Sequence, residues 1–153
     1  MRIKLMVLLL IVPCLLVTAA NAKNIHLKGG FSVLTYGITA GVEVDLQKYH
    51  LEAGGFSGIV DEGFYVNFTR SVGGDFLKIG GQYKSLKTHD ELLTFGLADE
   101  ETEYNVFGGI IEVSIFRKFF LKPYLRGEVM SYNPVKEGRD SFIGLNVCFG
   151  ISI

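Results

Sequence analysis

The sequence predicts an all-β protein whose strands close into an eight-stranded antiparallel up-and-down barrel. First, residues 142–153 alternate between large apolar and small or polar side chains, as a strand with two different faces requires. Second, the same period of two recurs between turn sequences along the chain, with no helical period after Lys23. Third, tight turns alternate with longer connections, a layout typical of up-and-down barrels.

We expect the eight strands at 25–35, 37–46, 49–60, 63–71, 75–86, 104–116, 119–132 and 141–153. Tight turns lie at 47–48, 72–74 and 117–118, and the other connections lie at 36–37, 61–62, 87–103 and 133–140. Because antiparallel neighbours turn at alternating ends, the tight turns share one end of the barrel with both termini. Pro123 lacks a ladder donor and therefore predicts a bulge in the seventh strand.

Each expected strand has one apolar face. In chain order, the residues of that face are Leu27, Phe31 and Val33; Ile38, Ala40, Val42, Val44 and Leu46; Tyr49, Leu51 and Ala53; Phe64, Val66 and Phe68; Leu77, Ile79 and Tyr83; Phe107, Ile111, Val113 and Ile115; Phe119, Leu121, Pro123, Leu125 and Val129; and Ile143, Leu145, Val147, Phe149, Ile151 and Ile153.

The composition of the two faces predicts which one points inward. The polar face is rich in glycine, including Gly41, Gly54 and Gly108, and this suits a crowded interior. The apolar face suits contact with lipid, and aromatic residues near strand ends predict interfacial girdles; they are Tyr49, Tyr83, Tyr104, Phe116, Phe119, Phe120 and Tyr132. We therefore expect a transmembrane barrel, with a soluble barrel whose apolar face lines a ligand cavity as the alternative.

Residues 1–22 are typical of a cleaved secretory signal, because Arg2 and Lys4 precede an apolar stretch that ends in a small-residue cleavage site. Cleavage leaves one barrel domain at 23–153, with 13 basic and 16 acidic residues and a net charge of −3. That charge favours no nucleic-acid partner. Cys148 is then the single cysteine, so an internal disulfide is excluded.

Charged residues on the polar face predict a network inside the barrel. The expected inward-facing charges are Lys28, Glu43, Asp45, Glu52, Lys78, Glu112, Lys122, Arg126 and Glu128, with His50 beside them. An eight-stranded barrel is just filled by its side chains, and an unpaired buried charge is costly. We therefore expect a paired structural plug, and the alternative is a selective path for ions or solutes.

The sequence predicts no catalytic residue, no cofactor and no metal site. The histidines are His26, His50 and His89, and the spacing of the chain assembles no nucleophile, base and orienting group. The acidic residues of the segment 87–103 lack the spacing and the glycine of a calcium loop. The same segment contains Leu92, Leu93, Phe95 and Leu97, which either contact an extracellular partner or extend the flanking strands.

The export signal, strand rhythm, loop asymmetry and closing run 144–153 resemble the small eight-stranded outer-membrane barrels of the outer membrane protein X and attachment-invasion type. The resemblance is architectural and departs at Ile153, where such barrels usually end in an aromatic residue. It implies a bacterial outer-membrane location, contact with outer-membrane lipid, insertion by the barrel-assembly machinery, and a non-enzymatic structural or adhesin-like role. Two alternatives are a lipid-A-modifying enzyme and a soluble periplasmic carrier of a hydrophobic ligand.

Overall fold

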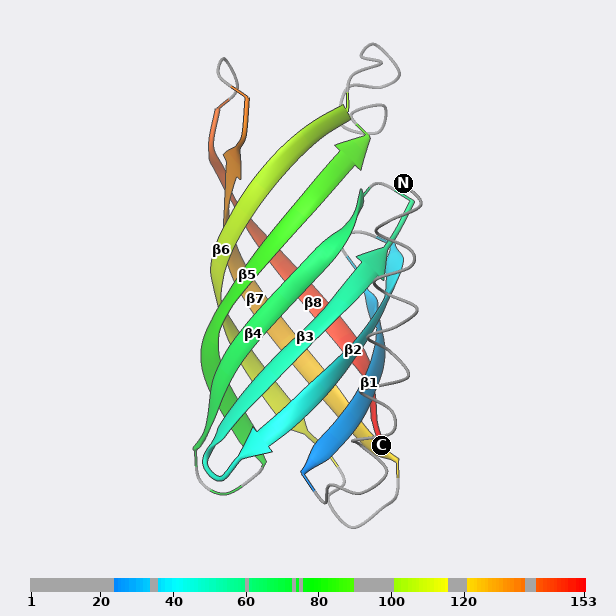
Figure 1. Cartoon of the computed structure of the whole chain (residues 1–153), viewed down its shortest axis with the longest axis vertical. Coiled ribbons are helices and arrows are strands. Elements are labelled where there is room, and N and C mark those ends of the chain that lie inside the picture. Colours follow the sequence, from blue (N-terminus) through cyan, green and yellow to red (C-terminus); the bar gives the residue numbers. More distant parts are fainter. Residues whose placement is uncertain are drawn as a thin grey trace.

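The computed structural model describes residues 24–33, 36–59, 61–72, 74, 76–89, 101–115, 121–136 and 140–153. They form eight strands: β1 (Ile25–Ser32), β2 (Gly37–Leu46), β3 (Tyr49–Ser57), β4 (Asp61–Val72), β5 (Leu77–His89), β6 (Glu101–Ser114), β7 (Lys122–Pro134) and β8 (Phe142–Ser152). The strands pair in chain order as a closed antiparallel barrel (Figure 1), so the predicted fold class is confirmed. Within the described ranges, no helix is long and apolar enough to cross a membrane.

The two ends of the barrel carry different connections. The β2–β3 turn and the C-terminus lie at the lower end of Figure 1, where β4 ends and β5 begins, and the end of β5 and the start of β6 lie at the upper end. Leu46 pairs directly with Tyr49, so Gln47 and Lys48 form a two-residue turn in which Gln47 has φ 63°. We call the lower end of the barrel in Figure 1 the turn end and the upper end the loop end. The proposed signal at 1–22 lies outside the described residues.

The hairpin of β5 and β6 is longer than the sequence predicts. The sequence predicts that these strands end at 86 and begin at 104, whereas pairing continues to His89 and Glu101. Lys87 and Glu103 form an ion pair of 3.2 Å across this extension. The strands therefore extend into the segment at 87–103, and the proposed contact residues Leu92, Leu93, Phe95 and Leu97 lie outside the described residues.

The bulge predicted at Pro123 is wrong. The β7–β8 ladder keeps one register from the pair Lys122–Ser152 to the pair Tyr132–Phe142. The carbonyl of Pro123 accepts a hydrogen bond of 2.9 Å from the N–H of Ile115, so its nitrogen faces the end of β6. Only one ladder donor is lost there, and no extra residue is needed to absorb the loss.

The polar face of the sheet points inward and the apolar face points outward, as the glycine-rich face suggests. On the outer surface Ile143 is 77%, Leu145 70% and Ile38 68% exposed. The charged side chains on the opposite face are almost all buried, Arg126 and Glu112 among them. The apolar outer face therefore surrounds a polar interior.

Two aromatic residues assigned to an interfacial girdle lie inside the barrel instead. Tyr104 and Tyr132 are both 6% exposed, and their rings meet edge to face at 6.2 Å. The physical reason is strand period: Tyr104 shares its face with Glu112, and Tyr132 shares its face with Arg126, both of which point inward. They belong to an apolar cluster that also contains Phe56, Tyr65, Leu86, Val106 and Met130. The interior towards the loop end thus contains an apolar cluster.

Candidate functional site

The centre of the barrel contains a buried ion network built on Glu112. The Arg126 guanidinium donates to Glu112 from Nε at 2.9 Å and from a terminal nitrogen at 2.5 Å, and it also binds Glu52. Lys28 donates to both oxygens of Glu112 at 2.7 Å and to Glu52 at 3.2 Å. Arg126, Lys28, Glu52 and Glu112 come from different strands, β7, β1, β3 and β6. The network therefore ties together opposite walls of the barrel.

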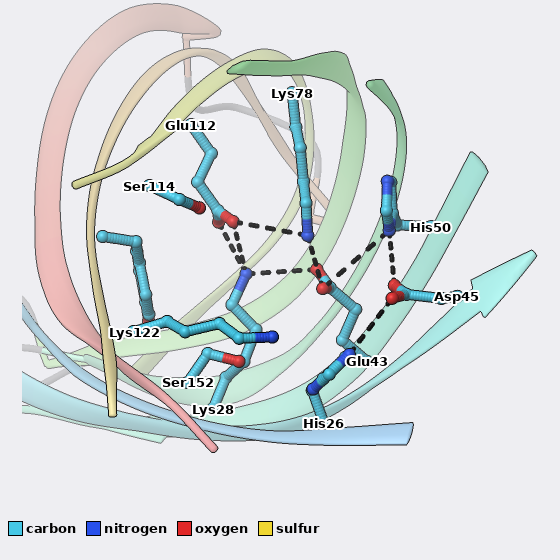
Figure 2. A pocket seen from close by; sticks show the side chains of 11 residues that line it. His26, Lys28, Glu43, Asp45, His50, Lys78, Glu112, Ser114, Lys122 and Ser152 are labelled. Atoms are coloured by element: carbon cyan, nitrogen blue, oxygen red, sulfur yellow. Dashed lines mark hydrogen bonds and ion pairs between the residues drawn. The ribbon is translucent and has the colours of Figure 1, made fainter. Parts of the chain in front are cut away.

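Glu43 and Lys78 extend this network towards the turn end. Glu43 accepts hydrogen bonds from Lys78 and, at 3.2 Å, from Lys28, and Figure 2 shows both ammonium groups pointing between Glu43 and Glu112. The network, which we call the central ion network, has three cations, Lys28, Lys78 and Arg126, and three carboxylates, Glu43, Glu52 and Glu112. This balance offsets the desolvation of charges that would be too costly to bury alone.

A smaller polar group lies nearer the loop end. Lys84 donates to Glu128 at 2.6 Å, and the amide of Asn146 donates to the same carboxylate at 2.8 Å. Ser32 in turn donates to the amide oxygen of Asn146 at 3.2 Å. The buried charge of Glu128 is therefore paired with Lys84. The sequence reading did not name Lys84, although it lies two residues from Gln82 on the inward face of β5.

Two interior tyrosines lie over pairs of glycines. A Cβ atom built on Gly41 or on Gly54, which face each other across β2 and β3, would lie 2.5 or 2.6 Å from the Tyr65 hydroxyl. Tyr124 covers the facing pair Gly30 and Gly150 in the same way. Both rings lie beside the central ion network, because Tyr65 hydrogen-bonds Glu52 and Lys28 lies 4.5 Å from the centre of the Tyr124 ring. The glycines thus make room for the tyrosines that pack the lumen.

Two cavities in the described part of the barrel lie on either side of the bond between Arg126 and Glu112. A cavity of about 110 Å³ at the turn end is lined in part by Glu112 and Lys28. A cavity of about 20 Å³ nearer the loop end is lined in part by Arg126 and Glu128. The bond between Arg126 and Glu112 therefore lies between the two cavities. Charges of both signs line each space, unlike the rings of one sign that line selective pores.

The turn-end cavity has a group of imidazoles and carboxylates on one wall (Figure 2). His26 Nε2 lies 3.1 Å from Asp45 Oδ2, and His50 Nδ1 lies 2.5 Å from Asp45 Oδ1. His50 Nε2 lies 2.7 Å from the Ser71 hydroxyl, and Glu43 Oε1 lies 4.0 Å from His50 Nδ1. We call His26, Asp45 and His50 the mouth cluster.

Ser71, His50 and Asp45 form a chain of nucleophile, base and orienting carboxylate that the sequence reading did not assemble. The hydrogen-bond order matches that of a serine hydrolase. Two features weigh against catalysis. The Ser71 N–H donates to the Lys48 carbonyl at 2.8 Å and cannot also bind an oxyanion. Ser71 is not among the residues that line the cavity, so that cavity does not present a substrate to its hydroxyl.

The structure brings most of the predicted interior charges into contact. Lys28, Glu43, Glu52, Lys78, Glu112 and Arg126 form the central ion network, and Glu128 lies above it. Asp45 is partly exposed and contacts histidines rather than a lysine or arginine. Lys122 lines the turn-end cavity, and no carboxylate in the described part of the chain pairs with it. The sequence reading did not name Ser71 or Lys84, although strand period places both on the inward face.

Comparisons of the chain with protein-family models, with curated proteins and with solved structures find no match.

Proposed function

We propose that this chain is an integral protein of a bacterial outer membrane, acting as a structural or surface-interaction protein without enzymatic activity. The observation that carries the proposal is the pairing of an apolar outer surface with a charged, internally bonded core. Large apolar patches on a protein surface mark contact with a membrane or a partner. Here every strand carries exposed apolar side chains, so the apolar surface runs all the way around the barrel. A lipid bilayer can contact such a surface on all sides.

The packed interior supports a structural role over transport. Arg126 and Glu112 bond across the lumen between the two cavities, and moving solute past them would separate a buried ion pair. Breaking such a pair costs about 3–5 kcal/mol. We therefore propose that the work of the protein lies outside the lumen, at the lipid surface or at the loop end.

The expected partners follow from that placement. Outer-membrane lipid would surround the apolar outer face, and the barrel-assembly machinery would insert the chain after export through the signal at 1–22. An extracellular partner would meet the segment 87–103, whose flanking strands extend to His89 and from Glu101. The apolar residues between them, Leu92, Leu93, Phe95 and Leu97, are the proposed contacts.

The two alternative functions, a soluble carrier and a lipid-A-modifying enzyme, would each require a different arrangement of side chains. A soluble carrier needs its apolar faces around a cavity, whereas Ile143 and Leu145 face outward. A lipid-A-modifying enzyme needs a nucleophile that lipid can reach, whereas Ser71 lies on the inward face beside His50. Altered acyl chains in the lipid of a deletion strain would favour the enzyme and contradict our proposal.

The test is heat-modifiability of the protein from a membrane fraction. A closed membrane barrel stays folded in dodecyl sulfate at room temperature, so the unboiled protein is expected to migrate faster than the boiled protein. Recovery in a water-soluble fraction with a bound hydrophobic ligand and no mobility shift would overturn the proposal. The same gel gives a folded-state readout for every variant described below.

A further inference from the structure

We propose that His26, Asp45 and His50, the mouth cluster, form a binding site for a divalent transition-metal ion of the zinc class at the turn end of the barrel. The inference does not depend on where the barrel resides or on what its loops bind. It rests on the register of three strands, the distances between the side-chain atoms, the local charge, and access through the turn-end cavity.

Strand register places the ligands next to one another. Asp45 on β2 pairs directly with His50 on β3, and Glu43, two residues earlier on β2, pairs directly with His26 on β1. Residues two apart on a strand share a face, so all four side chains lie on one inward-facing patch. Two imidazoles and a carboxylate are a donor set that zinc and its neighbours in the transition series accept.

The distances suit a shared ion. Ligand atoms bound to zinc at about 2.1 Å in tetrahedral geometry stand roughly 3.4 Å apart. The separations here are 3.1 Å from His26 to Asp45 and 2.5 Å from His50 to Asp45, and 4.0 Å from His50 to Glu43. The ligand atoms of Glu43, Asp45 and His50 all lie within 4.8 Å of one another, whereas His26 contacts the second oxygen of Asp45. Asp45 and His50 would therefore hold the ion first, and the His26 ring would have to shift towards His50 to become the third ligand.

Ser71 supports the orientation of one ligand. The hydroxyl of Ser71 lies 2.7 Å from His50 Nε2, and a His50 tautomer that donates from Nε2 leaves the lone pair of Nδ1 facing Asp45. Histidine ligands of metals usually donate their other ring N–H to an oxygen in this way, which fixes the ring. His50 is also buried, with 3% of its surface exposed, so its ring is held by packing as well.

The local charge favours the binding of a cation. The central ion network balances its own charges, with Lys28 and Lys78 held by Glu43 and Glu112. Asp45 adds a negative charge outside that balance, and its described contacts are with two imidazoles. Lys122 lines the same cavity, but within the described ranges it forms no ion pair with Asp45. A bound divalent ion would compensate the Asp45 carboxylate.

An ion can reach the site from the turn end. His26, Asp45 and His50 all line the cavity of about 110 Å³, which exceeds the share of about 30 Å³ that one liquid water occupies. The Asp45 side chain is 30% exposed, so the cluster lies at the mouth of the cavity. Water ligands would complete the coordination, and the mouth would allow the ion to exchange.

The experiment is a titration of the folded, untagged protein in detergent with Co²⁺, followed by competition with Zn²⁺. Low-coordinate cobalt bound by imidazole and carboxylate absorbs in the visible range, so one equivalent of Co²⁺ is expected to produce a spectrum that Zn²⁺ abolishes. A wild-type protein that gives no such spectrum, and no binding of Zn²⁺ by calorimetry, overturns the proposal directly. No variant is needed for that outcome.

Variants then assign the ligands. His26→Gln, Asp45→Asn and His50→Gln are each expected to weaken binding by more than about 100-fold, while Ser71→Ala weakens it by about 10–100-fold, as supporting residues do. His89→Gln is the matched control, because it removes a histidine at the other end of the barrel and should leave binding unchanged. Equal binding by the control and by the three ligand variants would show adventitious sites and overturn the proposal.

Discussion

Arg126 binds both Glu52 and Glu112 in the central ion network, and removing it should destabilise the barrel strongly. Arg126→Ala would leave Glu52 and Glu112 buried with fewer donors. Removing one partner of a buried ion pair costs about 3–5 kcal/mol. We expect the urea concentration that unfolds half of the protein to fall, measured by loss of the fast-migrating band in unboiled gels. The chain contains no tryptophan, so the gel is preferable to intrinsic fluorescence.

Arg70→Ala is the control for this prediction. Arg70 is exposed on the outer face and lies 5.9 Å from the centre of the Tyr49 ring, an exposed contact worth about 0.5–1 kcal/mol. If Arg126→Ala and Arg70→Ala unfolded at the same urea concentration as the wild type, Arg126 would not contribute to the stability of the barrel. The central ion network would then be a poor account of how the interior is stabilised.

A second residue-scale prediction concerns the contact between Gly54 and Tyr65. A Cβ atom at position 54 would meet the Ala40 carbonyl oxygen at 2.3 Å and the Tyr65 hydroxyl at 2.6 Å. The first of these atoms belongs to the backbone and cannot move without disturbing the β2–β3 ladder. Gly54→Ala is therefore expected to lower the stability by about 1–3 kcal/mol, as overpacking does. The measurement is again unfolding in urea.

Gly127→Ala serves as the matched substitution. A Cβ atom there meets nothing within 4 Å, and replacing glycine in a strand removes an entropic cost of about 0.5–1 kcal/mol. We expect Gly127→Ala to be neutral or mildly stabilising. Equal effects of the two substitutions would mean that the close approach of Tyr65 does not limit position 54.

At the scale of elements, the faces of the strands were predictable and their ends were less so. The alternation in β8 fixes an outward Leu145 and an inward Asn146 without any tertiary information. The extension of β5 and β6 to His89 and Glu101 depends on mutual pairing rather than on apolar pattern. The position of Tyr104 near a strand end predicts an interfacial girdle, but its parity with Glu112 places it inside the barrel.

The contacts inside the barrel could not be predicted from the sequence, although most of their members could. Lys28 and Glu112 are separated by 84 positions, and they meet across the lumen only because the closed barrel has a particular stagger between strands. In contrast, the pairs His26–Glu43 and Asp45–His50 lie on strands joined in sequence. The two-residue turn at 47–48 fixes the second pair, so two of the three residues of the mouth cluster were within reach of sequence reasoning.

For the whole molecule, the outward apolar face separates the membrane proposal from a soluble barrel. Leu145 is 70% exposed on β8 and pairs with the outward Val129, which lies near the middle of β7. In lipid, an arginine at this depth costs about 2–4 kcal/mol. On a water-covered surface the same change is expected to alter stability by no more than about 0.5 kcal/mol.

Leu145→Arg is therefore expected to lower the stability of the barrel in phospholipid vesicles by about 2–4 kcal/mol, measured by urea unfolding on unboiled gels. Glu62→Arg is the control, because Glu62 is exposed near the loop end of β4, where the cost of a charge falls to about 0–1 kcal/mol. A large loss for Leu145→Arg alone is the pattern that a lipid belt around mid-barrel produces. Equal and small changes for both variants would place Leu145 in water, and the proposal of a membrane barrel would fail with it.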